Sequence, residues 1–302
     1  MSTSAMSSSI WAKRTMPEGD TLHRIKLALR PLVGHAVEAL SLPRVGIGES
    51  LVGEVVEDVD AIGKNLLISF SGGLVLHTHL KMTGLWHRYA RDEPWRRPRD
   101  RAVAVLVAGP FEAVCFSAPI ARLVARKRIA RELSLPMRGT DVIRDDLDTA
   151  LVLNRLRALP PETPLCVALL SQGAVSGIGN VYVNELCFRA RRSPATPLSL
   201  VDDNALRVII DDAAAVMRQN VDMPSAAGSS EAVAHYRYIR TTTTAFGVAA
   251  ADARGCASGK GPIAVYGRAG QPCPVCGATI VMTRQGPLRR VTFHCPHCQP
   301  ST

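Results

Sequence analysis

The chain has 302 residues, and its 36 lysines and arginines against 26 acidic residues give a formal charge of +10. Because 47% of the residues are hydrophobic, the chain can bury a sizeable core, which excludes a disordered polycation. No run of about 18 apolar residues is present, so a membrane-spanning helix is excluded as well. Only six of the basic residues are lysines. Arginine pairs with phosphates through two hydrogen bonds, so nucleic acid is the first partner to consider, although a GC-rich genome would favour arginine too.

The first sixteen residues are rich in serine, contain no acidic residue and have no apolar stretch of the kind that marks a secretion signal. They faintly resemble an organelle transit peptide, but a start codon at Met16 explains them better, so we treat residues 1–15 as an extension. A secreted disulfide scaffold would be smaller and denser in cysteine than this chain. We therefore expect a reducing, cytoplasmic compartment.

The N-terminal half reads as one helix followed by short strands. Residues 21–33 place Leu22, Ile25, Leu29 and Leu32 at helical spacing, which predicts an opening helix. The runs that follow are dense enough in hydrophobic residues to predict antiparallel strands of a sandwich. They occupy residues 51–60, 65–70, 74–80, 102–108 and 111–116.

Two polar segments interrupt this pattern, and the chain then becomes helical. Residues 91–101 are predicted to form a loop broken by prolines, and residues 126–140 a basic interdomain linker. After about residue 141, apolar residues recur three and four positions apart, and Asp202 opens the last such segment as a helix cap. The predicted helices occupy residues 146–158, 164–172, 180–190 and 202–219.

Four cysteines in the last thirty residues form the strongest metal signal in the chain. Two Cys-x2-Cys pairs, separated by eighteen residues, can present four thiolates to a tetrahedral zinc ion. Four protein ligands leave no open position, so we expect one structural Zn²⁺ and no catalytic role for it. The spacer is long enough for a β-hairpin that carries basic residues. The predicted ligands are Cys273, Cys276, Cys295 and Cys298.

The segment Met16-Pro17-Glu18-Gly19-Asp20 resembles the N-terminus of the Fpg/Nei family of DNA glycosylase/AP lyases, whose mature chains begin with Pro-Glu. The continuation through Gly19-Asp20-Thr21 is more similar to the endonuclease VIII (Nei) branch. The resemblance extends over residues 16–299, and several independent motifs occur in the expected order. They are Gly63–Leu67, His79–Gly84, Gly177–Glu185, Val265–Arg268 and Arg290–Phe293.

The resemblance implies four catalytic residues. Pro17, once it is the N-terminal residue, has a secondary amine that forms an iminium with sugar C1′. Glu18 beside it would act as acid and base during opening of the sugar ring. Lys64 would hold a phosphate and assist β-elimination. Arg290, on the zinc hairpin, would hold the phosphates that flank the flipped nucleotide and take part in δ-elimination.

The resemblance also implies DNA contacts outside this set. Met82 occupies the family's insertion loop, where an apolar wedge fills the gap left by the flipped base, and Lys81 precedes it. Asn180, which opens a predicted helix after two glycines, would contact a backbone phosphate. Arg138 lies at the junction between domains, where a DNA contact and a solvated charge are equally expected.

The implied fold is an α+β multidomain chain that binds damaged DNA, duplex or single-stranded, as a monomer. An N-terminal β-sandwich with flanking helices would span residues 16–132, a helix–two-turns–helix domain 140–250 and a zinc finger 264–300. The Nei-like start favours oxidised pyrimidines as substrates. If Pro17 is not exposed, the alternative is a non-catalytic zinc protein that binds nucleic acid. One family feature is missing, because no Arg-Phe pair for the orphaned base occurs in residues 116–122.

Overall fold

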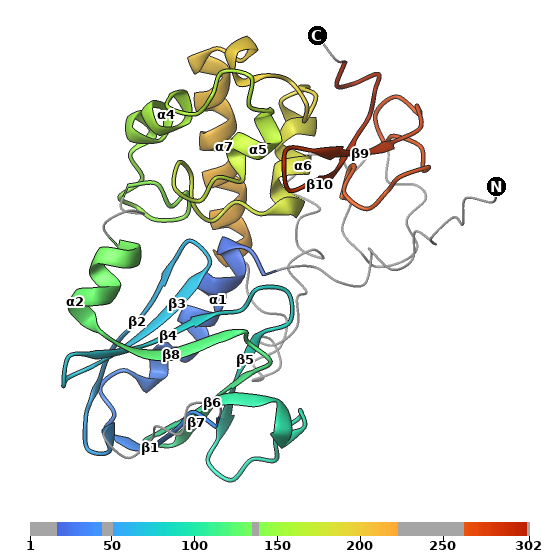
Figure 1. The fold of residues 1–302 in the computed structure, drawn as a ribbon. Helices are drawn as coiled ribbons and strands as arrows, with labels where there is room; N and C mark the ends of the chain where they lie inside the picture. The colour runs from blue at the N-terminus through green and yellow to red at the C-terminus, as the bar shows by residue number, and fades with distance from the viewer. Residues whose placement is uncertain (1–16, 44–50, 135–138, 223–262, 301–302) are drawn as a thin grey trace.

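The computed structural model describes residues 17–43, 51–134, 139–222 and 263–300, which form three units in chain order (Figure 1). The first unit is a sandwich of two four-stranded antiparallel sheets, one with strand order β2-β3-β4-β8 and the other β1-β6-β7-β5. The strands are β1 (Val37–Ser41), β2 (Val56–Ile62), β3 (Asn65–Phe70), β4 (Leu74–His79), β5 (Leu85–Ala90), β6 (Ala102–Ala108), β7 (Phe111–Phe116) and β8 (Ile120–Ala125).

The core of this unit lies between the sheets and under helix α1 (Gly19–Leu29), which continues into the 3-10 turn η2 (Arg30–Leu32). Leu22, Ile25 and Leu29 are fully or almost fully buried, as their helical spacing predicts. Phe70 and Trp86 pack in the same core. The predicted opening helix and the sandwich are therefore confirmed.

The structure adds three strands that the sequence pattern did not predict. β1 contains a bulge between Val37 and Ala39, which breaks the two-residue alternation. β5 carries polar His87 and Arg88 within its six residues, and β8 is mostly half-buried. Periodicity alone recognises none of the three, because their hydrophobic faces are incomplete.

The predicted linker at 126–140 is helical from 126 to 134, and its described end at 139–140 is a turn. Helix α2 (Arg126–Ile129) continues as the π-helical turn η5 (Ala130–Ser134). Ile129 and Leu133 pack on a small apolar cluster outside the sheet that contains β2, β3, β4 and β8, together with Val75 and Val124. Only two apolar residues make this contact, and basic residues surround them in the sequence. The pattern therefore predicts a linker where the structure has helical turns.

The second unit is a helical domain built on the predicted segments. Its helices are α4 (Thr149–Arg157), α5 (Leu165–Leu169), α6 (Asn180–Arg189) and α7 (Asp203–Asp222). Asp148 caps α4 by accepting a hydrogen bond from the Leu151 amide at 2.9 Å, and Asp202 accepts one from the Ala205 amide at 2.8 Å, as predicted for α7. The end of α7 reaches α1 of the first unit (Figure 1).

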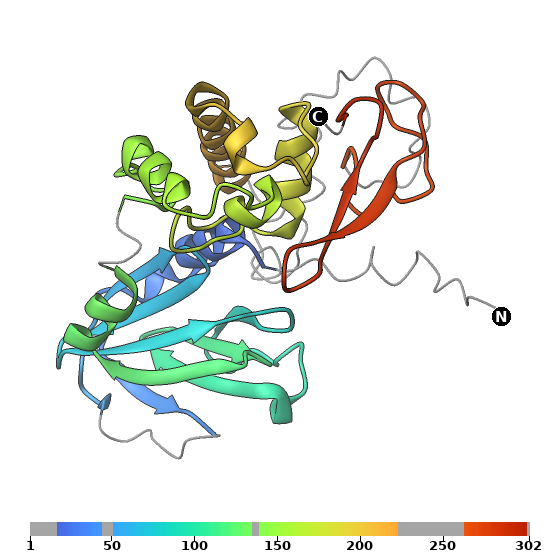
Figure 2. The same ribbon diagram turned by 45° about the horizontal axis from the view of Figure 1, so that its top comes forward.

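The third unit is a two-stranded hairpin, β9 (Val281–Gln285) and β10 (Arg290–His294), which lies beside α6 (Figure 2). The Phe293 amide donates a hydrogen bond to Asn184 Oδ1 of α6 at 2.5 Å. Gln299 Nε2 donates to the Arg192 carbonyl at 2.9 Å. The predicted zinc hairpin is thus present and fixed to the helical domain. No helix in the described part of the chain is both long and apolar enough to cross a membrane.

Candidate active site and zinc centre

Glu18 lies where the three units meet, although it belongs to the segment just before α1. Its side chain is completely buried. The two carboxylate oxygens accept hydrogen bonds from the first amides of α6, Val181 N at 2.8 Å and Tyr182 N at 3.3 Å. The N-terminus of α6 therefore holds an anion, as expected of a helix N-terminus, but that anion is the protein's own carboxylate.

Glu18 reaches α6 through two close contacts, each at a glycine where a side chain would clash. The Gly19 amide donates a hydrogen bond to the Gly177 carbonyl at 2.9 Å, and a Cβ on Gly19 would lie 2.9 Å from Gly177 Cα. A Cβ on Gly179 would lie 2.2 Å from Glu18 Cδ. The glycines in this turn thus serve close packing against the first turn of α1, which the sequence pattern alone did not indicate.

The environment of Glu18 suits proton transfer near neutral pH. Burial raises the pKa of the Glu18 carboxyl to about 7, and the opposing effects of Lys64 and of the two α6 amides are smaller. A carboxyl with this pKa is partly protonated at neutral pH and can both donate and accept a proton.

Lys64 stands in the turn between β2 and β3 and is electrostatically coupled to the other predicted basic residues. Burial lowers the pKa of the Lys64 ammonium, Glu18 opposes this shift, and Arg290 and Lys81 add to it. The structure therefore brings Glu18, Lys64, Lys81 and Arg290 into one electrostatic site, although they come from four separate parts of the chain.

Pro17 is buried directly before Glu18. Its role as the nucleophile stays a prediction. Arg138, the remaining predicted contact, lies outside the described residues.

The turns around the site carry left-handed backbone at residues other than glycine. Lys81 has φ 50°, Ser117 has φ 53° and Arg289, next to Arg290, has φ 47°. Such conformations are costly and persist where the surrounding structure enforces them, often at functional sites. Met82, which follows Lys81, has an exposed fraction of 49%, so it is not a core residue.

Asn180 is half-buried at the first position of α6, where Gly179 occupies the cap. Its Nδ2 donates a hydrogen bond to the Val291 carbonyl of β10 at 3.1 Å. The Asn180 side chain therefore connects α6 to the zinc hairpin. Its acceptor, Val291, is the residue that follows Arg290 in β10.

Asp141 is a residue that the sequence reasoning missed. It is buried in the helical domain, and its Oδ2 accepts a hydrogen bond from the Gly63 amide at 2.6 Å. Its Oδ1 accepts from the Ile143 amide at 3.1 Å. Asp141 thus fixes the turn that presents Lys64, across a sequence separation that no local pattern indicates.

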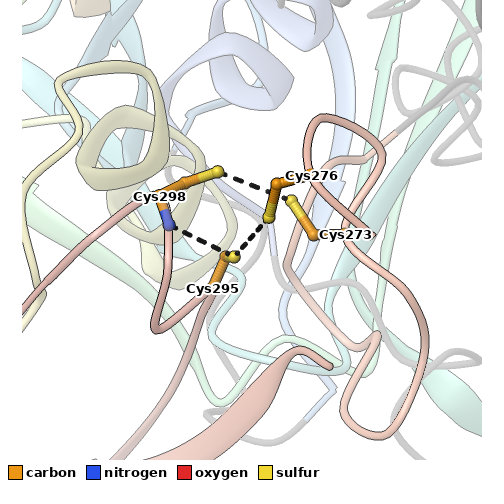
Figure 3. A group of neighbouring side chains, drawn as sticks. All are labelled: Cys273, Cys276, Cys295 and Cys298. Carbon is orange, nitrogen blue, oxygen red and sulfur yellow. Dashed lines mark hydrogen bonds between the residues drawn. The ribbon is translucent and has the colours of Figure 1, made fainter. Parts of the chain in front are cut away.

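The four terminal cysteines converge from two loops (Figure 3), and their sulfur atoms all lie within 4.8 Å of one another. The Cys273–Cys298 and Cys276–Cys295 sulfur pairs are 3.9 Å and 3.4 Å apart. Tetrahedral coordination at about 2.3 Å places thiolates roughly 3.8 Å apart, so these distances fit zinc and not disulfides. The predicted structural zinc site is confirmed, and it lies away from Glu18, at the far end of the hairpin from Arg290.

A β-sandwich, a helix–two-turns–helix domain and a zinc hairpin that meet at a buried glutamate define a DNA glycosylase scaffold. Sequence comparison agrees with this class for each unit. Residues 16–117 match the formamidopyrimidine-DNA glycosylase N-terminal domain, residues 139–231 its helix–two-turns–helix domain, and residues 270–300 the zinc finger found in FPG and IleRS.

Whole-chain comparisons identify the family. A protein of Streptomyces coelicolor named "Probable endonuclease 8 2" is 32% identical over 94% of both chains. The "DNA-(apurinic or apyrimidinic site) lyase Nei2" of Mycolicibacterium smegmatis is 33% identical over 95% of this chain and all of the relative. The chain therefore belongs to the Fpg/Nei family. The fold is also that of Lactococcus lactis Fpg bound to DNA containing N7-benzyl-Fapy-dG, with TM-score 0.73, 19% identity and coverage of 94% and 100%.

Proposed function

We propose that this protein is a bifunctional DNA glycosylase/AP lyase that excises oxidised bases and then cleaves the abasic strand. The observation that carries the proposal is the fully buried Glu18 carboxyl, which follows Pro17, interacts electrostatically with Lys64 and is held by the first amides of α6. Burial raises the pKa of this carboxyl to about 7, which suits a group that donates and accepts protons at neutral pH. The scaffold acts as a monomer in this proposal.

The first chemical step uses the secondary amine of Pro17, which requires that Met16 begins the chain and is removed. An α-amino group has a pKa near 8, so a substantial fraction is unprotonated at neutral pH. The amine attacks C1′ of the damaged nucleotide, the glycosidic bond breaks, and the proton lost from the amine goes to the departing base. Glu18 then protonates the ring oxygen O4′, the C1′–O4′ bond breaks, and the nitrogen lone pair forms the iminium.

Strand cleavage follows from the iminium. Removal of a proton from C2′ expels the 3′ phosphate in β-elimination, and Lys64 stabilises the charge on the phosphate. A second elimination expels the 5′ phosphate, and Arg290, which is exposed at the start of β10, binds it in this proposal. Both cations lie within electrostatic reach of each other, which suits two phosphates that flank one sugar.

Borohydride trapping on an oligonucleotide with one abasic site tests the proposal. Protein that begins at Pro17 is expected to form a covalent adduct, and Pro17→Gly is expected to lose it. Salt-sensitive binding without any adduct would support the alternative, a non-catalytic zinc protein that binds nucleic acid. Intact-mass analysis of active native protein checks the start, because retention of Met1 would contradict the role of Pro17.

Oxidised pyrimidines are the proposed main substrates. Support comes from the Gly19-Asp20-Thr21 continuation and from the "endonuclease 8" names of similar proteins. Initial excision rates on matched duplexes with an oxidised pyrimidine or an oxidised purine decide this point. Faster excision of the oxidised purine would contradict the preference and leave the lyase proposal intact.

A further inference from the structure

The edge of the sandwich that carries Lys64 continues well beyond the catalytic residues. Strand register orders this edge: Asn65 pairs with His79, and the turn 80–84 leads from β4 into β5. At the start of β5, Leu85 pairs with Phe116, and Phe116 pairs on its other side with Ala102. The edge therefore runs from Lys64 past Met82 to the segment before Ala102.

Hydrogen bonds join these turns into one surface. Thr83 Oγ1 donates to the Ser117 carbonyl at 2.9 Å, and the Ser117 amide donates to the Arg101 carbonyl at 2.8 Å. A Cβ on Gly84 would lie 2.9 Å from Ala118 Cα, so the turn that carries Met82 packs directly on the next turn. The position of Arg101 is thus tied to that of Met82.

Arg101 is the last residue of the 3-10 turn η4 (Arg99–Arg101), at the end of the segment 91–101. This segment packs on a small apolar cluster through Trp95. The ring of Trp95 stacks on Tyr89 and meets Phe116 edge-on, and its Nε1 donates to Glu112 at 2.8 Å. The Arg99 guanidinium lies over the Trp95 ring, 4.5 Å from its centroid. This stacking orients the Arg99 fork before any ligand binds, which lowers the entropy lost on binding.

The arginines of this segment fall into two groups. Arg91 pairs with Glu38, and Arg96 lies 3.7 Å from Glu93. Arg97, Arg99 and Arg101 are exposed, and none of them forms an ion pair with any residue that the structure describes; Arg99 and Arg101 are the two nearest to the Ser117 turn. Arg99, oriented by Trp95, and Arg101, positioned through its backbone, therefore stand near the Met82 turn without an ion-pair partner among the described residues.

We propose that Arg99 and Arg101 bind backbone phosphates of the strand opposite the lesion in duplex DNA. This inference rests on the proposed function. A wedge such as Met82 enters the base stack, which lies between the two backbones. In the proposed function Lys64 and Arg290 hold the damaged strand, and Lys64 follows β2 of one sheet while Arg99 and Arg101 precede β6 of the other, so we assign these two arginines to the other strand. Leu85, three residues after Met82, and Ala102, next to Arg101, are two strand spacings apart, about 10 Å, so the two arginines stand to one side of the wedge.

The experiment compares Arg99→Gln/Arg101→Gln with the wild type on two probes of equal sequence, a duplex and a single strand, each with one abasic site. Binding is measured over a series of salt concentrations. The double variant is expected to bind the duplex about tenfold more weakly, and the slope of log K against log salt is expected to fall by about 2. The single strand is expected to lose much less affinity than the duplex.

Arg30→Gln/Arg207→Gln is the matched control, because both arginines are exposed and the change in charge is the same. Arg30 follows the end of α1 remote from Glu18, and Arg207 is on α7. The control is expected to keep the wild-type duplex affinity and salt slope. Equal losses on both probes, or equal losses in the control, would overturn the assignment to the opposite strand.

Trapping by borohydride separates this inference from the function on which it rests. If wild-type protein traps no abasic DNA, the proposed function fails. If the wild type traps DNA and the double variant keeps full duplex affinity with an unchanged salt slope, only the assignment of Arg99 and Arg101 fails. Thermal unfolding of both double variants shows whether either substitution has altered the fold.

Discussion

Glu18 combines complete burial with two backbone hydrogen bonds, and these act in opposite directions on its charge. The amides of Val181 and Tyr182 favour the carboxylate, but burial is the larger effect and raises the pKa to about 7. Below pH 4.5 the group is protonated in both the folded and the unfolded chain, so it adds no pH dependence there. Between about 4.5 and 7 the unfolded chain releases the proton first, so folding becomes less favourable as pH rises.

The Glu18→Gln substitution removes this contribution to the pH dependence of the free energy of unfolding. The free energy of unfolding of the variant minus that of the wild type is expected to increase from pH 4.5 to pH 7, by roughly 3 kcal/mol at most. Above pH 7 the difference is expected to stay constant. Chemical denaturation at a series of pH values measures it. A difference that stays flat over the whole range would show that the Glu18 pKa is not raised.

Gly179 tests the close contact at the same carboxyl. Its backbone, with φ −123°, suits alanine, so any effect of Gly179→Ala comes from the new Cβ, which would lie 2.2 Å from Glu18 Cδ. We expect a loss of stability of about 1–3 kcal/mol and a marked fall in trapping of abasic DNA. Gly173→Ala is the matched control, because nothing lies within 4 Å of its added Cβ. Similar behaviour of the two variants would contradict the contact.

At the scale of elements, the turn between β2 and β3 depends on the helical domain for its position. Asp141→Ala leaves the buried Gly63 amide without its acceptor, which costs about 1–3 kcal/mol, and it frees the turn that presents Lys64. We expect a lower kcat for cleavage with little change in KM. Asp141→Asn keeps an oxygen acceptor and is expected to restore most of kcat. If neither variant changes kcat, the turn does not need Asp141 to place Lys64.

The same elements show how far the sequence predicts this fold. Helices and strands with complete hydrophobic faces, such as α1 with Leu22 and Leu29 or the buried strand β3, follow from periodicity. The bulged β1 and the polar β5 do not, because burial in them depends on neighbours that are distant in sequence. Motifs predict Glu18 and Lys64 as site residues, but only the tertiary structure reveals Asp141, because no spacing connects it to Gly63.

At the scale of the whole molecule, the net charge of +10 is informative only together with the positions of the charged side chains. Many arginines are neutralised by partners, as Arg126 is by Glu57 and Arg189 is by Asp212. The basic residues coupled around Lys64, Lys81 and Arg290 come from the sandwich and from the zinc hairpin, so their electrostatic field requires both units in place. Composition alone predicted a nucleic-acid partner and could not predict this arrangement.

Two kinds of interaction hold the zinc hairpin in position: the metal site and hydrogen bonds to the helical domain. Phe293 and Gln299 bind to the helical domain through hydrogen bonds that do not involve the cysteines. Cys273→Ser removes one thiolate from the four-cysteine site and is expected to release zinc, which a chromogenic chelator measures. We expect the loops that hold β9 and β10 to loosen without zinc, so that Arg290 loses the orientation proposed for phosphate binding.

We therefore expect Cys273→Ser to bind abasic DNA more weakly, with a smaller salt slope, while the sandwich stays folded. Hydrogen exchange locates the change: amides of β9 and β10 are expected to exchange faster, and those of β3 and β7 as in the wild type. The sandwich has its own core around Phe70 and Trp86, which does not include any residue of the hairpin. Loss of zinc with unchanged affinity would mean that the hairpin does not contact DNA, and faster exchange in β3 would mean that the units do not fold independently.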